Sequence, residues 1–206
     1  PPNYGSPVTM AAARDLIRNS TLAARIRLDI ETDVLAPTVD IPEQSFDWVV
    51  FSLFSWYFGS VDEFRKVMAR TRKWAKRLAY AEWDARPTTA EQIPHLMAVL
   101  LRAQLEAFKL QSDANLRTLI TFAAAKQAAV EAGWNIERYQ SILTPEMQDA
   151  RWEVELVLKD VETELSQIEN MPGKFKTLIK SQTQLLNSLA QKGTMLPLPT
   201  NAFVGS

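Results

Sequence analysis

Residues 45–58 read SFDWVVFSLFSWYF, and together with LAYAEW at residues 78–83 they decide the fold class. The run from Trp48 to Phe51 is continuous, aromatic and β-branched, which is typical of a strand buried on both faces. Between the two segments, Ser60 and Glu63 have the spacing of a helix capping box. A strand, a helix and a second strand at this spacing predict parallel strands joined by a right-handed crossover, and hence an α/β sheet.

The chain before these segments contains a loop, a helix and a further strand pattern. Residues 1–9 carry three prolines and a glycine, and Thr9 is a suitable N-cap for a helix that begins at Met10. Apolar and charged residues then alternate over residues 26–31, which predicts a strand that ends near Asp33. Active sites of such sheets lie at the carboxyl ends of the strands, here near Asp33, residues 52–57 and residues 82–84.

Helical patterns dominate the rest of the chain. Apolar stripes predict helices near residues 96–108 and 116–132, the second ending at Gly133, and residues 134–143 suit a strand. Two further stripes, at residues 154–168 and 175–189, predict a C-terminal helical hairpin. The stripes could form a dimer seam or the packed core of the hairpin, and we favour packing onto the sheet, because both stripes are wide and each has a partner within the chain. We therefore divide the chain into residues 1–145, a core whose residues 88–122 form a lid, and residues 146–206, a helical appendage with a terminal extended segment.

Composition restricts the classes of partner. With 23 Lys and Arg against 24 Asp and Glu, the net charge of -1 gives no excess of cations for nucleic acid. The basic residues between Arg65 and Arg77 are better explained as the solvent face of the crossover helix. No apolar run reaches the roughly 20 residues of a membrane span. The absence of cysteine excludes disulfides and thiolate metal sites and fits a reducing compartment, so a cytoplasmic location is expected.

Four segments together resemble the class I methyltransferases that use S-adenosylmethionine (SAM), in particular those that act on small molecules and natural products. PPNYGSPVTMAAARDLI at residues 1–17 resembles the loop and helix after the second sheet strand of that family. IRLDIETDV at residues 26–34 resembles the third strand, SFDWVVFSLFSWYF the fourth, and KRLAYAEWD at residues 76–84 the fifth. The resemblance covers about the first 140 residues and implies a Rossmann-like parallel-sheet core.

The family's glycine-rich loop and the acidic residue that closes its second strand have no counterpart in this sequence. Only six glycines are present, and none have the GxGxG spacing. Aligned in this way, Pro1 falls just after the missing acidic residue. We therefore expect the N-terminal portion of the fold, with its first two strands, to be supplied by polypeptide outside this chain.

The resemblance implies transfer of the sulfonium methyl group of SAM to a small organic molecule, without a metal. By matching position, Asp33 would accept the adenine amino group, Val34 would donate its backbone N–H, and Ser52 and Leu53 would flank the methionyl end. Tyr4 and Gly5, in the preceding loop, would also contact the cofactor. The acceptor molecule would lie against the aromatic side chains Trp56, Tyr57 and Trp83, since such rings attract cations and stack on planar groups.

His95 and Glu82 are the candidate catalytic residues. His95 is the only histidine and therefore the only imidazole base available, and Glu82 offers a carboxylate at the same edge of the sheet. Each candidate also has a structural interpretation: a surface or helix-end histidine at His95, a helix-capping or solvated carboxylate at Glu82, a turn aspartate at Asp33, or core aromatics at residues 56–57. Two other functions stay open, a catalytically silent binding or scaffold subunit and a SAM-fold enzyme that catalyses a rearrangement.

Overall fold

The computed structural model describes residues 9–30, 32–112 and 114–206, and the chain divides into two compact units at residues 40 and 41. In the first unit, helix α1 spans Met10–Arg18. Its N-cap is Thr9, whose side-chain oxygen accepts a hydrogen bond from the backbone N–H of Ala12, as the sequence predicts. The second unit contains the sheet and the other α-helices of the described chain.

The predicted strand at residues 26–31 is wrong. The described residues 26–30 adopt no strand, and the side chains of Ile26 and Leu28 are exposed. Arg27 instead pairs with Asp29 two residues further on. An alternating pattern forms a strand only when another strand accepts its hydrogen bonds, and the described part of this unit contains no such partner.

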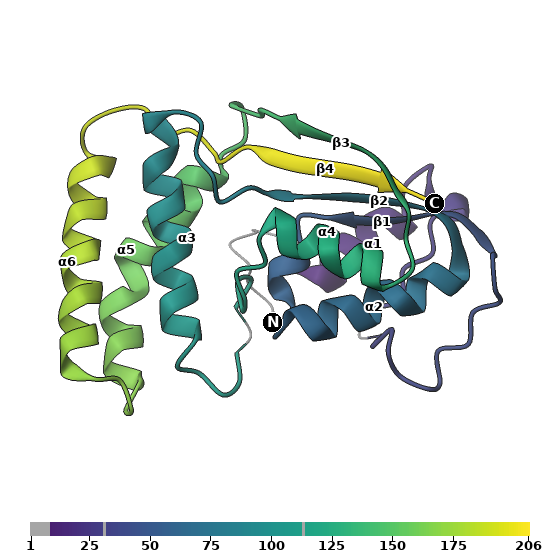
Figure 1. Ribbon diagram of the computed structural model, residues 1–206, viewed down its shortest axis with the longest axis horizontal. Coiled ribbons are helices and arrows are strands. Elements are labelled where there is room, and N and C mark those ends of the chain that lie inside the picture. The colour runs from purple at the N-terminus through teal and green to yellow at the C-terminus, as the bar shows by residue number, and fades with distance from the viewer. Residues whose placement is uncertain (1–8, 31, 113) are drawn as a thin grey trace. The chain divides into compact units, whose positions relative to one another are not determined.

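The second unit is built on a four-stranded sheet with the order β1-β2-β4-β3 (Figure 1). Strand β1 spans Phe46–Ser52 and pairs in parallel with β2, Ala75–Trp83. Helix α2, Val61–Trp74, connects them, and the Ser60 side chain caps it by accepting from the N–H of Glu63. The predicted parallel α/β unit is therefore confirmed.

The C-terminal residues form a central strand. Strand β4, Thr200–Gly205, lies between β2 and β3, Ile136–Ile142, and is antiparallel to both. Its terminal Gly205 comes so close to the neighbouring chain that an added Cβ would lie 2.7 Å from the carbonyl oxygen of Asn135. The terminal extended segment of the sequence analysis thus contains a strand of the sheet.

Strand β1 is not buried on both faces, in contrast to the sequence-based expectation. Trp48 is 43% exposed and Val50 is 63% exposed, and Phe51 is the only fully buried residue of the strand. Within the described sheet β1 is an edge strand that pairs with β2 alone. The guanidinium of Arg77 covers the Trp48 ring at 4.4 Å. Aromatic and β-branched composition therefore identified the strand correctly but not its surroundings.

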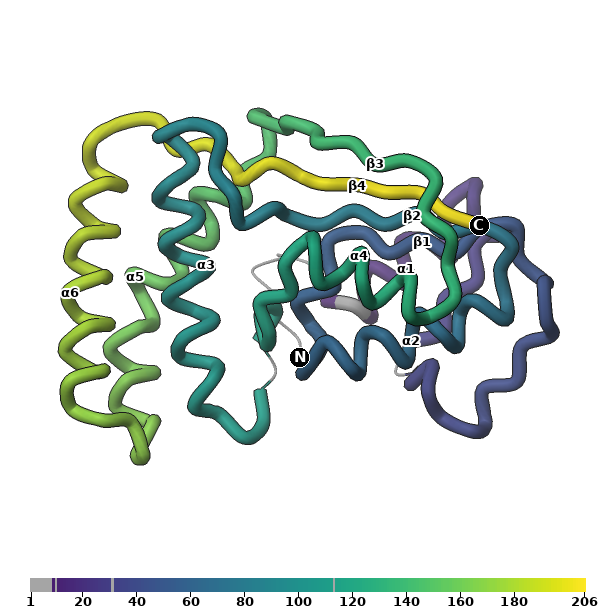
Figure 2. Tube along the Cα trace, in the orientation of Figure 1, coloured from purple at the N-terminus to yellow at the C-terminus, as the bar shows by residue number. Residues whose placement is uncertain are grey.

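Helices α2 and α4, Phe122–Glu131, pack against one face of the sheet (Figure 2). Tyr80 and Phe203 stack at 4.5 Å on that face, where Phe64 of α2 and Phe122 of α4 contact them. Helix α4 begins at residue 122 rather than 116. It ends at Glu131 and is followed within two residues by Gly133, whose φ of +91° is the left-handed conformation expected of a glycine after a helix.

Residues 116–121 are held out of the helix by hydrogen bonds to the turn after β1. The Trp56 indole N–H donates to the carbonyl oxygen of Ile120 over 2.9 Å, and the N–H of Arg117 donates to the carbonyl oxygen of Trp56 over 2.8 Å. These bonds connect the loop at 107–121 to the carboxyl end of β1. They replace the helical hydrogen bonds that the sequence pattern predicts for this segment.

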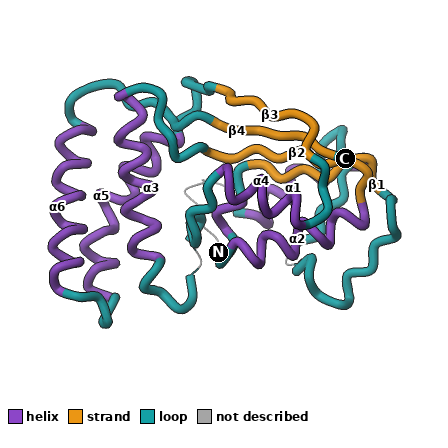
Figure 3. Tube along the Cα trace, viewed as in Figure 1, coloured by secondary structure: helices purple, strands orange, loops and turns teal. Residues whose placement is uncertain are grey.

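Three helices lie side by side next to the sheet: α3, Ile93–Glu106; α5, Asp149–Gln167; and α6, Gly173–Ala190 (Figures 1 and 3). The predicted hairpin α5–α6 is present, but its apolar stripes meet α3 to make a bundle core of their own rather than covering the sheet. Among the described residues, no helix is both long and apolar enough to cross a membrane. The buried members of this core are Ala98, Leu101, Leu105, Val154, Val157, Val161, Leu165, Ile168, Met171, Ile179 and Leu186.

The basic side chains of α2 and β2 pair with acidic or aromatic groups of the same unit. Lys66 forms an ion pair with Asp62, and Arg77 forms one with Glu137. The guanidinium of Arg72 lies over a tryptophan ring at 4.9 Å. These contacts agree with the interpretation of the basic run as the outer face of a crossover helix.

Candidate active site

A cavity of about 90 Å³ lies where β1 and β2 end. The turn after β1 contributes Leu53, Trp56 and Tyr57, and the end of β2 contributes Glu82 and Trp83. The other walls come from α3, from the loop at 107–121 and from the start of α5. Every lining residue belongs to the second unit, and six of them were predicted as site residues. The remaining lining residues are His95, Val99, Asn115, Leu116, Asp149 and Glu153.

A buried carboxylate holds the turn after β1 in place. Glu82 Oε2 accepts from the backbone N–H of Ser55 over 2.7 Å and from its hydroxyl over 2.8 Å, while Oε1 accepts from the N–H of Trp83 over 3.0 Å. The Tyr80 hydroxyl is 3.0 Å from the Ser55 hydroxyl, which extends the network. Burial raises the pKa of Glu82, and the hydrogen bonds from Ser55, Trp83 and Trp56 act in the opposite direction. Glu82 therefore positions the turn as well as lining the cavity.

The backbone is strained where the chain leaves β1. Leu53 has a φ of +52°, in the left-handed region that non-glycine residues avoid at a cost of roughly 1–3 kcal/mol. Its N–H donates to the carbonyl oxygen of Ala81 over 2.9 Å. Ser52, the last residue of β1, is exposed beside it. The turn thus begins with a conformation that its surroundings impose, as is common at functional sites.

His95 is 0% exposed and lies in the first turn of α3. Its Nδ1 accepts a hydrogen bond from the backbone N–H of Leu198 over 3.0 Å, and its ring meets that of Trp83 edge-on at 5.5 Å. Burial lowers the pKa of His95 to about 4, so the ring is neutral near pH 7. Because Nδ1 accepts an N–H, the proton of the neutral ring is on Nε2, which has no partner among the described residues. In this tautomer Nε2 is a donor, whereas the predicted base would need a free lone pair there.

Sequence reasoning missed Glu153, Asp149 and Asn115. Glu153 Oε1 accepts from the side-chain N–H of Asn115 over 2.9 Å, and its Oε2 has no partner among the described residues. Burial raises the pKa of Glu153. Asp149 and Glu153 are four residues apart at the start of α5 and so share one helix face. That spacing was the available signal, but it is equally typical of a solvated helix.

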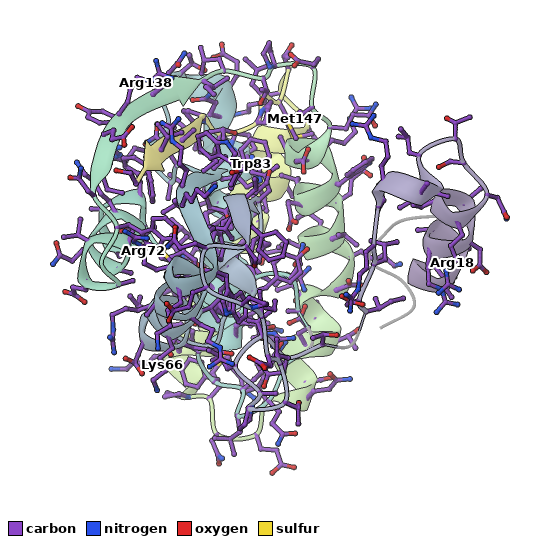
Figure 4. The ribbon with its side chains drawn as sticks, turned by 90° about the vertical axis from the view of Figure 1, so that its right-hand side faces the viewer. Arg18, Lys66, Arg72, Trp83, Arg138 and Met147 are labelled. Carbon is purple, nitrogen blue, oxygen red and sulfur yellow. The ribbon has the colours of Figure 1, made fainter. Side chains whose placement is uncertain are left out.

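Two tryptophans form apolar walls of the cavity. Trp56 and Trp83 are buried, and Figure 4 labels Trp83 among the interior side chains of the second unit. Tyr57 is half-buried beside them. The next acidic residue, Asp84, does not join this site, since it is bound by Arg86 at 2.7 Å and by the side-chain N–H of Asn201 at 2.6 Å.

The other predicted cofactor residues belong to the first unit. Asp33 Oδ1 accepts from the N–H of Leu35 over 2.8 Å, which makes an Asx-type turn, and Val34 is half-buried. Tyr4 and Gly5 lie outside the described residues. No group of three acidic or histidine side chains in the described ranges is placed to hold a metal ion.

No protein-family model and no curated protein matches this chain. A solved structure does: a cyclopropane-fatty-acyl-phospholipid synthase-like protein from Lactobacillus casei ATCC 334 is 26% identical and aligns over 100% of this chain and 72% of its own, with a TM-score of 0.79. The [4+2]-cyclase SpnF aligns over 97% of this chain and 62% of its own at 12% identity and a TM-score of 0.49. A SAM dependent methyltransferase from Archaeoglobus fulgidus aligns over 80% of this chain and 61% of its own, with 10% identity and a TM-score of 0.39.

The fold is therefore that of the class I SAM-dependent methyltransferases, with a mixed α/β core and a central sheet in which β1 and β2 are parallel. The alignment with the Lactobacillus structure over the whole chain carries this conclusion. The family resemblance and the fold class predicted from the sequence are confirmed. The cavity at the carboxyl ends of β1 and β2 is where an α/β sheet of this kind places its ligand.

Proposed function

We propose that this chain takes part in SAM-dependent methyl transfer to a small organic molecule, and that the acceptor binds in the cavity at the ends of β1 and β2. One observation carries the proposal: in a fold of this class, the cavity brings six predicted site residues to the carboxyl edge of the parallel strands. Aromatic walls and buried polar groups there suit an enclosed acceptor.

The residues present fit the charged part of SAM. The rings of Trp56 and Trp83 attract a sulfonium cation, and the cavity contains acidic side chains but neither lysine nor arginine among the described residues. When bound, SAM supplies an electrophilic methyl group. Ser52 and Leu53 would contact its methionyl end, and Asp33 with Val34 its adenine. The loop containing Tyr4 and Gly5 would complete the cofactor site.

The protein's own contribution is enclosure and orientation. Trp56, Tyr57 and Trp83 would hold the acceptor and exclude water, which favours in-line transfer by fixing the distance and angle of attack. His95 and Glu82 are the residues we propose for proton handling, His95 as a donor at Nε2 in the tautomer described above. Helix α3 and the loop at 107–121 lie in the region 88–122 that we propose as the lid.

Two assembly proposals accompany this function. Polypeptide outside this chain would supply the remaining strands, next to the open edge of β1. A homodimer would use the outer faces of α5 and α6, where Trp152, Leu178 and Leu185 are exposed. Sedimentation of the full chain tests the second, since substituting Leu178 and Leu185 by Gln should convert a dimer to a monomer.

Calorimetric titration with SAM and its demethylated product S-adenosylhomocysteine (SAH), followed by incubation of the full chain with isotopically labelled SAM and candidate acceptors, tests the function. We expect SAM and SAH to bind, and we expect the isotopically labelled methyl group to be found on one of the candidate acceptors. Failure of a complete polypeptide to bind either one would favour a silent binding subunit. Cofactor binding with an isomerised, unlabelled product would favour a rearrangement enzyme.

A further inference from the structure

Two residues that line the cavity each have a buried side-chain atom without a partner among the described residues, Nε2 in His95 and Oε2 in Glu153. Buried polar groups in folded proteins are almost always hydrogen-bonded, so each unpaired one requires an explanation. His95 is 0% exposed and its other nitrogen is already bound to Leu198. The pair therefore consists of one donor, at His95 Nε2, and one acceptor, at Glu153 Oε2.

The charge of the lining favours a cationic ligand. Its carboxyl side chains are Glu82, Asp149 and Glu153, and no lysine or arginine lines the cavity in the described ranges. Arg102, which lowers the pKa of Glu153 from a distance, is itself bound to Glu164 at 2.9 Å. Burial and Asp149 act the other way and raise it. A bound cation would compensate the negative charge of Glu153.

The aromatic walls and the size of the cavity narrow the ligand further. Tryptophan and tyrosine rings, here Trp56, Tyr57 and Trp83, stabilise an adjacent organic cation. A volume of about 90 Å³ has room for roughly six water-sized groups, which is enough for a few non-hydrogen atoms but not for a drug-sized molecule.

We propose that the cavity binds a small protonated amine that also carries an oxygen acceptor. The ammonium N–H donates to Glu153 Oε2, and His95 Nε2–H donates to the oxygen, so that both unpaired atoms are satisfied by one molecule. This assignment rests on the proposed function, because it identifies the acceptor of the methyl group as an amine. Glu153 is then the residue that binds the ammonium and can take its proton at Oε2.

A sulfonium is also an organic cation, but it has no N–H with which to satisfy Glu153. The two sources of positive charge can therefore be distinguished. An amine site requires an N–H donor, whereas a site for the sulfonium alone would accept any cation of similar size.

The test is a titration of the full chain with ethanolamine, followed by the indole N–H resonances of the tryptophans in nitrogen-15-labelled protein. We expect saturable shifts for two indoles, those of Trp56 and Trp83. Ethylamine, which lacks the oxygen, should bind more weakly. Tetramethylammonium, which has no N–H, and ethylene glycol, which has no charge, should not compete. Equal binding of either of the last two would overturn the proposal.

Substitutions of Glu153 and His95 test the contact that each residue is proposed to make with ethanolamine. Glu153→Gln keeps an oxygen for Asn115 but loses the charge, so ethanolamine affinity should fall about tenfold. Glu155→Gln, on the exposed side of the same helix, is the matched control and should leave affinity unchanged. His95→Asn should remove the advantage of ethanolamine over ethylamine. If Glu153→Gln fails to fold by circular dichroism, Glu153→Asp replaces it, and unaltered affinity in a folded variant refutes the assignment.

The same samples titrated with SAH separate this inference from the proposed function. SAH binding without amine binding removes the inference and leaves methyl transfer in place. Amine binding by a complete polypeptide that binds neither SAM nor SAH removes the proposed function and leaves the amine site.

Discussion

The backbone N–H of Leu198 donates to Nδ1 of His95 over 3.0 Å, joining the segment before β4 to the start of α3. This single bond has two effects. It fixes the proton of the neutral imidazole on Nε2, and it connects the bundle to the sheet at the edge of the cavity. The predictions about His95 follow from both effects.

Replacing His95 tests the tautomer. In His95→Asn the side-chain oxygen can take the place of Nδ1 and accept from Leu198, whereas His95→Ala leaves that buried N–H unpaired. We expect the Ala variant to lose about 1–3 kcal/mol of unfolding free energy more than the Asn variant. Urea unfolding monitored by tryptophan fluorescence measures the difference. Equal losses would show that the bond to Leu198 contributes nothing to stability.

The same residue makes stability depend on pH. The folded-state pKa of His95 is about 4 and its ordinary value is 6.5, so between these values the unfolded chain binds more protons. The stabilisation from a neutral buried ring is complete above pH 6.5 and is lost as the pH falls to 4, a change of about 3 kcal/mol. Glu82 and Glu153, whose pKa values are raised, act in the opposite direction over acidic pH.

The wild type and the His95→Asn variant both contain Glu82 and Glu153. The difference between their pH dependences of stability therefore reports on the imidazole alone. Unfolding free energies at pH 7 and at pH 4.5 should differ more for the wild type than for the variant. Parallel pH curves would mean that His95 is protonated to the same extent in the folded and unfolded chains.

Glu82→Gln should destabilise the protein. The amide can supply only one acceptor oxygen, so either Ser55 or the N–H of Trp83 would face an NH₂ group instead of an oxygen. The expected loss is about 1–3 kcal/mol in urea unfolding. Glu155→Gln, exposed on α5, is the control for removal of a charge and should change stability little. A variant as stable as that control would contradict the role of Glu82 in holding the turn.

The unit β1-α2-β2 was predictable because its signals are local. The capping residue Ser60, the periodicity of α2 and the composition of the strands all act within a few residues of chain. The strand predicted at residues 26–31 was wrong because a strand depends on a distant partner. Alternating residues indicate which face is apolar, but they do not indicate whether a partner strand is present. The exposure of Trp48 was missed for the same reason, because the composition of β1 does not indicate what packs against it.

The candidate site was half predictable. Trp56 and Trp83 lie next to recognisable strand ends, and His95 lies at the start of the helix that follows β2, so their place in the chain indicated their place in the cavity. Glu153 lies on a helix far along the sequence, and its carboxyl group reaches the cavity only because α5 packs against α3. Residue patterns in a single sequence do not reveal how two helices pack, and a charged residue next to an apolar stripe is ordinarily solvated.

Asp33 can be tested for its proposed cofactor role separately from its turn. Both Asp33→Ala and Asp33→Asn remove a carboxylate oxygen that could accept the adenine amino group, so each should weaken SAH binding about tenfold. Only Ala also removes the acceptor for the N–H of Leu35. Calorimetry on a polypeptide that binds SAH measures the effect. An affinity unchanged in Asp33→Asn would leave Asp33 as a turn residue alone.

Two adjacent leucines of α6 provide the sharpest test of the bundle core. Leu186 is 0% exposed and packs between α3 and α5, whereas Leu185 is 59% exposed. Leu186→Ala removes the same atoms as Leu185→Ala but leaves a cavity, so it should cost about 2–5 kcal/mol of unfolding free energy. Leu185→Ala should change stability by only about 0.5 kcal/mol.

Because the bundle forms one wall of the active-site cavity through His95 and Glu153, Leu186→Ala should also weaken ethanolamine binding at temperatures where the chain is still folded. Thermal unfolding and the indole titration, run on both variants, measure the two effects, and similar behaviour of the pair would contradict the assigned packing of α6.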